Sequence, residues 1–85
     1  MAWKKVRGKS TSTYVGTWRN ASRGLLMDVV YSSTDASSPD EWMVAVYDVG
    51  EGQDAELGSL VDRKKFGMNR SEAEDWADSY RRDHE

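Results

Sequence analysis

One stretch decides how this chain folds: Ser71-Glu72-Ala73-Glu74-Asp75-Trp76-Ala77-Asp78-Ser79-Tyr80-Arg81-Arg82. Its first four residues match a capping box, in which the Ser71 side chain accepts from the Glu74 amide and the Glu74 side chain reaches back to the Ser71 amide. Small and aromatic residues then recur three and four positions apart and share one side of a helix: Ala73, Trp76, Ala77 and Tyr80. The sequence therefore predicts an amphipathic helix capped at Ser71.

This helix needs a surface to lie on. Its first turn is acidic and its last turn carries Arg81 and Arg82, which suits the helix dipole. A helix of about a dozen residues is nevertheless marginal on its own. Burial of Trp76 and of Tyr80 contributes about 1.5–3 kcal/mol each before entropy is subtracted. We therefore expect the helix to pack on a sheet.

The residues upstream of the helix supply that sheet. Three segments rich in valine, threonine and aromatics are bounded by turn-forming residues: Thr11 to Trp18, Leu25 to Tyr31 and Trp42 to Val49. The third is apolar on both faces, which is typical of a central strand. We expect residues 57–66 to form a short fourth strand or an irregular edge of the sheet. The expected core residues are Val29, Val44, Val46, Phe66, Trp76 and Tyr80.

Strands followed by one helix indicate an α+β fold, with an antiparallel sheet of three to four strands and the C-terminal helix packed on one face. The 85 residues fit a single small domain, in which we treat residues 1–10 as a mobile basic arm. The chain has no cysteine, which excludes disulfides and thiolate metal sites. It also has neither a signal sequence nor an apolar run of membrane-spanning length, so we expect a cytoplasmic protein with no membrane partner.

Charge is segregated along the chain. The first 27 residues carry six cations and no carboxylate, whereas all 15 carboxylates follow from Asp28 onward. A basic segment interleaved with Trp3, Tyr14 and Trp18 is typical of single-stranded nucleic-acid binding. The candidate nucleic-acid-binding residues are Lys4, Lys5, Arg7, Lys9, Arg19 and Arg23, extended by Arg63, Lys64 and Lys65.

An interaction module is the other interpretation of the same sequence. A sheet with a helix on one side leaves its second face or a strand edge for another protein or a second copy. Trp3 and Trp42 would be natural anchors there. Trp18 is expected in the core instead. The primary expectation is therefore a small non-enzymatic binding or interaction domain, with nucleic acid as the alternative ligand.

Several motifs do not support catalysis or a cofactor. Gly8-Lys9-Ser10 resembles the end of a P-loop, but Trp3 stands where the first glycine belongs. The glycines of 50–55 are followed by acidic residues that would repel a pyrophosphate. Four acidic residues could suggest calcium but lack the EF-hand order: Asp48, Glu51, Asp54 and Glu56. With His84 as the single histidine, we expect no enzyme, no metal and no cofactor.

The stretch from Phe66 through Arg70-Ser71-Glu72-Ala73-Glu74-Asp75-Trp76-Ala77 to Tyr80 resembles the end of small haloarchaeal proteins of no assigned activity. The chain composition agrees, since Asp outnumbers Glu nine to six and isoleucine is absent. The resemblance covers about 20 residues. It implies strands first and a capped helix last, with no site residues to carry over.

Overall fold

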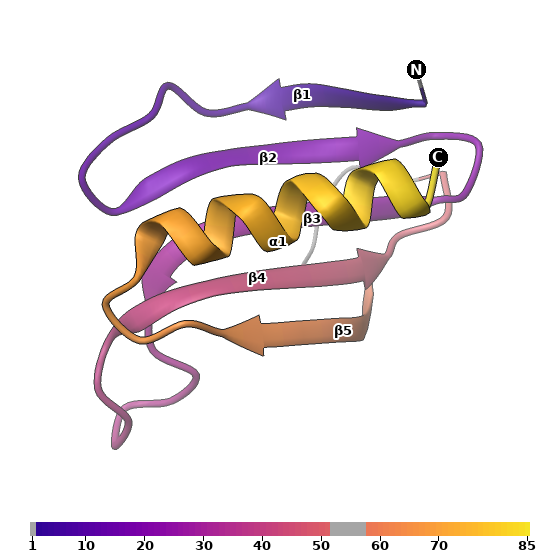
Figure 1. The fold of residues 1–85 in the computed structure, drawn as a ribbon. Coiled ribbons are helices and arrows are strands. Elements are labelled where there is room, and N and C mark those ends of the chain that lie inside the picture. Colours follow the sequence, from indigo (N-terminus) through magenta and orange to yellow (C-terminus); the bar gives the residue numbers. More distant parts are fainter. Residues whose placement is uncertain (1, 52–57) are drawn as a thin grey trace.

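The computed structural model describes residues 2–51 and 58–85. They form a five-stranded antiparallel sheet with one helix in front of it (Figure 1). The strands pair in chain order, and the elements are β1 (Trp3–Arg7), β2 (Tyr14–Asn20), β3 (Leu25–Ser32), β4 (Glu41–Asp48), β5 (Ser59–Lys65) and α1 (Arg70–Asp83). The predicted α+β class, the antiparallel sheet and the C-terminal helix are confirmed.

The predicted number of strands is wrong, because the sheet has five. The additional strand is β1, which lies in the segment that we expected to be a mobile arm. Trp3 holds this strand in place, since only 8% of its surface is exposed and its indole Nε1 donates to the His84 carbonyl at 3.2 Å. An edge strand with three cations is therefore attached to the fold by one aromatic side chain.

The predicted boundaries shift by a few residues. β2 begins at Tyr14 instead of Thr11, because the Thr11 side chain accepts from the Thr13 amide in a local turn. Residues 59–65 form a full strand rather than an irregular edge. Leu57, where we expected that segment to begin, lies outside the described residues.

The helix cap is Asn69, not Ser71. The Asn69 side-chain oxygen accepts from the Glu72 amide at 3.1 Å, and helix α1 begins at Arg70. The preceding turn selects this cap, since the Phe66 amide donates to the Trp42 carbonyl and the Asn69 amide donates to the Phe66 carbonyl. Asn and Ser are equally good caps. Tertiary hydrogen bonds therefore decide between two residues that local sequence ranks alike.

The core lies between α1 and the two strands under it. Figure 1 shows the helix crossing in front of β3, alongside β4. Three predicted core residues have no exposed surface: Val29, Val44 and Val46. The deepest helix residues are Ala73 and Ala77, whose small side chains let the helix approach the sheet closely. The other predicted core residues are half-buried and pack against this cluster: Phe66, Trp76 and Tyr80.

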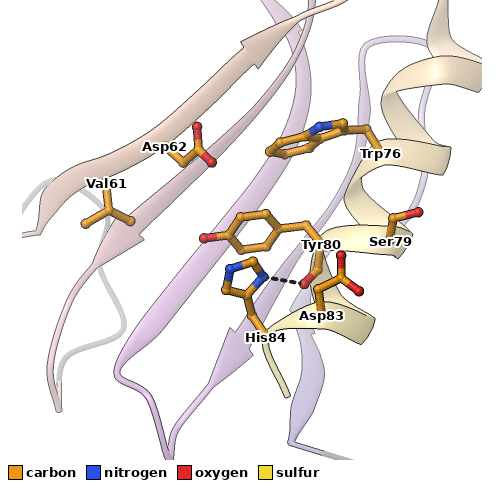
Figure 2. A pocket seen from close by; sticks show the side chains of 7 residues that line it. All are labelled: Val61, Asp62, Trp76, Ser79, Tyr80, Asp83 and His84. Carbon is orange, nitrogen blue, oxygen red and sulfur yellow. Dashed lines mark hydrogen bonds between the residues drawn. The ribbon is translucent and has the colours of Figure 1, made fainter.

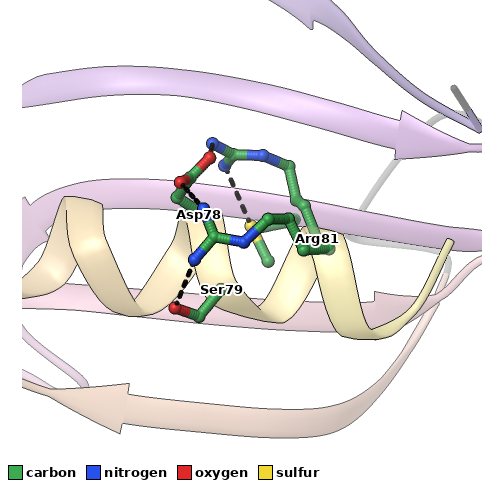
Figure 3. A network of polar contacts seen from close by, with 5 residues as sticks. Asp78, Ser79 and Arg81 are labelled. Carbon is green, nitrogen blue, oxygen red and sulfur yellow. Dashed lines mark hydrogen bonds and ion pairs between the residues drawn. The ribbon is translucent and has the colours of Figure 1, made fainter.

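A charged network closes the core on the β2 side. Arg81 lies over the Trp18 ring at 4.1 Å from guanidinium carbon to centroid, and its Nη1 contacts the Met27 sulfur at 3.6 Å. Asp78 pairs with Arg81 and also with Arg82 (Figure 3). Burial lowers the pKa of Arg81, although Asp78 acts against this. Trp18 is packed against the core, as expected.

Candidate functional site

Adjacent cations on one strand point to opposite faces of the sheet, because side chains alternate along a strand. Lys5 pairs with Trp18 and faces the helix, whereas Lys4 pairs with Arg19 and faces away from it. Alternation alone would return Arg7 to the side of Lys5. A β-bulge between Lys5 and Arg7 changes the register, so that Arg7 pairs with Thr17 on the side of Lys4.

We call the side of the sheet opposite α1 the far face. The strand registers place 16 paired residues on it: Lys4, Arg7, Tyr14, Thr17, Arg19, Leu26, Asp28, Val30, Ser32, Glu41, Met43, Ala45, Tyr47, Leu60, Arg63 and Lys65. Five of them are cations and two are carboxylates, a net charge of +3. The whole chain has a net charge of −3. The far face therefore concentrates positive charge on an acidic protein.

The structure brings five of the nine predicted nucleic-acid-binding residues to the far face: Lys4, Arg7, Arg19, Arg63 and Lys65. Lys5 and Lys64 lie on the helix side, over the rings of Trp18 and Phe66. Lys9 lies in the β1–β2 connection, and Arg23 in the turn after β2 donates to the Glu85 carbonyl at 2.9 Å. These four cations therefore do not belong to the far face.

Arg19 contributes charge to the far face but little accessible surface. Only 8% of it is exposed, and its Nη2 donates to the Gly50 carbonyl at 2.8 Å. This bond ties β2 to the turn after β4. The accessible cations are the four on the edge strands, two on β1 and two on β5.

A polar chain crosses the middle of the far face. The Thr17 hydroxyl donates to the Asp28 carboxylate at 2.5 Å and also contacts the Tyr14 hydroxyl. Thr17 is 2% exposed, and it pairs directly with Asp28 across β2 and β3. Asp28 is thereby fixed between the two basic edges. It adds a hydrogen-bond acceptor at the centre of a cationic surface.

Two half-buried tyrosines lie near this chain. Tyr14 reaches the face because a β-bulge between Tyr14 and Gly16 changes the alternation of β2. Tyr47 pairs with Leu26, and burial followed by the negative charge of Asp28 raises the pKa of Tyr47. Arg63 acts in the opposite direction on this group. Tyr47 was not among the expected stacking residues, although its alternation with Met43 in the sequence could have indicated it.

The expectation that Trp3 and Trp42 are available to anchor an interface is wrong. Trp3 is 8% exposed and Trp42 is 5% exposed, so neither is available as an interface anchor. Trp18 faces the helix between Lys5 and Arg81 and cannot act as a stacking platform for the far face. These indole rings pack on the helix side of the sheet, so tyrosines are the aromatic residues of the far face.

A second surface feature is a groove between α1 and β5 (Figure 2). Its volume is about 300 Å³. The helix side is formed by neighbouring aromatic rings, of which Trp76 and Tyr80 have centroids 5.3 Å apart. Asp62 faces them from β5. This groove has the opposite charge to the far face and lies on the other side of the sheet.

No group of three or more metal-binding side chains occurs in residues 2–51 and 58–85. Of the four acidic residues that could suggest calcium, Asp54 and Glu56 lie outside the described residues, as does most of the 50–55 motif. Within the same described part, no helix has the length and apolar character needed to cross a bilayer.

No known protein family, curated protein or solved structure matches this chain. The resemblance to haloarchaeal proteins therefore stays a prediction.

Proposed function

We propose that this chain is a non-enzymatic binding domain that holds single-stranded nucleic acid on the far face of its sheet. The observation that carries this proposal is the net charge of +3 on the far face of a chain whose net charge is −3. Cations that serve only to balance neighbouring carboxylates would be distributed among them. Here five of the twelve lie on a face with two carboxylates, one of which, Glu41, is 3.9 Å from Lys65.

The arrangement of these charges favours a flexible single strand. Neighbouring strands lie about 4.8 Å apart, so the basic edges β1 and β5 are separated by about 19 Å. Phosphates would contact Lys4 and Arg7 at one edge and Arg63 and Lys65 at the other. Bases would lie over the centre, where a phosphate would meet the negative charge of Asp28.

The centre of the far face provides groups that suit bases. Tyr14 and Tyr47 are half-buried aromatic rings, and base stacking on such rings contributes about 1–3 kcal/mol per base. The Asp28 carboxylate can accept a hydrogen bond from the exocyclic amino group of a base, because a carboxylate is an acceptor and the amino group is a donor. Stacking tolerates any base, so we expect weak sequence preference with some favour for bases that carry an amino group.

The test is fluorescence polarisation with labelled DNA and RNA single strands of about 12 nucleotides, a length within the usual range for small β domains. Four phosphate contacts at about 0.7 counterions each give a slope of about −3 in log K against log salt. The affinity should therefore fall roughly 50-fold between about 50 and about 200 mM salt.

Neighbouring residues supply a matched control. The variant with Lys4→Ala and Arg63→Ala removes two cations from the far face, and the variant with Lys5→Ala and Lys64→Ala removes two cations from the helix side of the same strands. Both change the net charge equally. The first should halve the salt slope to about −1.5, whereas the second should leave it near −3.

Equal weakening by both variants would reduce the effect to overall charge and contradict the proposed site. No polarisation change at low salt, together with a mass above 9.6 kDa by light scattering, would instead support self-association. That result would refute nucleic-acid binding and leave the far face as a protein interface.

A further inference from the structure

The groove between α1 and β5 has an aromatic wall built by the helix repeat. Trp76, Tyr80 and the C-cap His84 are four residues apart, so their rings follow one another along one side of the last turns of α1. The Tyr80 and His84 rings are 3.9 Å apart and nearly parallel, and His84 Nδ1 lies 2.9 Å from the Tyr80 carbonyl oxygen. Because Tyr80 has a ring on each face, its edge and hydroxyl are the parts left to meet a ligand (Figure 2).

The groove also contains two carboxylates, one on each of its walls. Asp62 lies on β5 and Asp83 on α1, and neither takes part in an ion pair within the described part of the chain. Asp78, five residues before Asp83, is by contrast paired with two arginines. Burial raises the pKa of the Tyr80 phenol, the charge of Asp62 raises it further, and the charge of Arg23 acts in the opposite direction.

The neighbouring cations have other contacts, but two of them border the groove: Arg82 donates to the Ser79 oxygen at 3.2 Å, and the charge of Arg23 acts to lower the pKa of Tyr80. Lys64, two residues after Asp62 on the same side of β5, lies over the Phe66 ring at 5.9 Å. Arg23 donates to the Glu85 carbonyl. Among the described lining residues there is no lysine or arginine. The groove is thus a volume of about 300 Å³ with negative charge on two walls and an aromatic surface along one of them.

We propose that this groove binds a cationic alkylamine, and that a linear diamine suits it best. An ammonium group has three donors and requires acceptors, which the two carboxylates and the Tyr80 hydroxyl provide. The methylene chain would lie along Val61 and the ring edges, as lysine stems lie on apolar surface. Two carboxylates on different elements favour two charges over one. Anions are disfavoured by the same carboxylates.

The experiment is an NMR titration of the full chain at constant ionic strength, observing the Trp76 indole N–H signal. The probes are putrescine and its neutral isostere 1,4-butanediol. Putrescine should shift the signal in a saturable manner, and butanediol should not. The substitutions Asp62→Asn and Asp83→Asn should each weaken the binding of putrescine about threefold to tenfold. Asp75→Asn, on the exposed side of α1, should leave this affinity unchanged.

A third probe, N-acetyl-lysine methylamide, separates a free amine from a lysine side chain of a partner protein. This probe carries one charge and should bind more weakly than putrescine, and binding as tight as that of putrescine would overturn the preference for a diamine and identify the occupant as a protein lysine. Equal shifts by putrescine and butanediol, or no shift by either, would overturn the proposal. The Asp62→Asn variant should bind oligonucleotides normally, since the groove and the far face are on opposite sides of the sheet.

Discussion

Replacement of Trp3 with alanine tests whether one side chain holds β1 in the sheet. Trp3 is the single buried residue of β1, and the other four are exposed. Its ring belongs to the core cluster together with Ala73 and Ala77 of α1. The substitution should therefore release the first strand and expose the end of the core that this strand covers.

The expected loss follows from the burial of the ring. Truncation of a buried tryptophan costs about 3–5 kcal/mol of unfolding free energy. The indole hydrogen bond contributes little to this figure, because the His84 carbonyl also accepts from the Asn20 side chain at 2.9 Å and keeps that partner. Trp3→Phe, which retains an aromatic ring but no donor, should accordingly lose much less, about 1–2 kcal/mol.

Urea denaturation followed by far-ultraviolet circular dichroism measures both variants without depending on tryptophan fluorescence. A domain of this size should have a total stability of about 4–13 kcal/mol, so Trp3→Ala removes a large share of it. The melting temperature should fall by at least about 12 °C. A loss below about 1 kcal/mol with an unchanged urea slope would show that β1 contributes nothing to the cooperative unit and would refute this reasoning.

Three further predictions concern a cap, a buried hydroxyl and a phenol. In urea denaturation, Asn69→Ala should lower the unfolding free energy by about 1 kcal/mol, whereas Ser71→Ala should change it by less than about 0.5 kcal/mol. The reverse order would show that Ser71 is the N-cap, as the sequence predicts. Thr17→Val keeps the shape of a 2% exposed side chain but removes the hydroxyl between a tyrosine and an aspartate of the far face, and should cost about 1–3 kcal/mol in the same assay. Burial, then the charge of Asp62, raises the pKa of Tyr80 above 10.0. The folded state therefore holds that proton more tightly than the unfolded chain, and stability is lost as pH rises above about 10. Between about pH 9 and about pH 11, the Tyr80→Phe variant should lose less unfolding free energy than the original protein. An identical loss in both proteins would show that Tyr80 does not cause the pH dependence.

The helix and the three inner strands could be predicted from periodicity because their side chains are buried in a regular pattern. Strand β1 could not, since a run of Trp-Lys-Lys-Val-Arg has the composition of a solvated segment. Its order depends on contact between Trp3 and His84, which are 81 residues apart in the chain. Burial of a single aromatic residue leaves no periodic signal.

The sequence predicts which residue types form the candidate site, but it does not predict on which face of the sheet each residue lies. Alternation assigns Lys4 and Arg7 to opposite sides, and the bulge between Lys5 and Arg7 brings them together. The same holds for Tyr14 and Thr17 on β2. A bulge depends on how two strands fit each other, so the sequence of one strand does not reveal it. The two carboxylates of the groove, Asp62 and Asp83, are also brought together by tertiary structure alone.

The unequal distribution of charge between the far face and the rest of the molecule has a kinetic consequence. With +3 on one side, the remaining residues carry −6, so the molecule has a large electric dipole despite its modest net charge. A polyanion would repel it at long range and turn the sheet toward itself at close approach. Lowering the ionic strength should then slow the approach of the protein to the polyanion at long range, while it speeds binding at the surface of the far face. Stopped-flow association rates should therefore pass through a maximum as the salt concentration is varied.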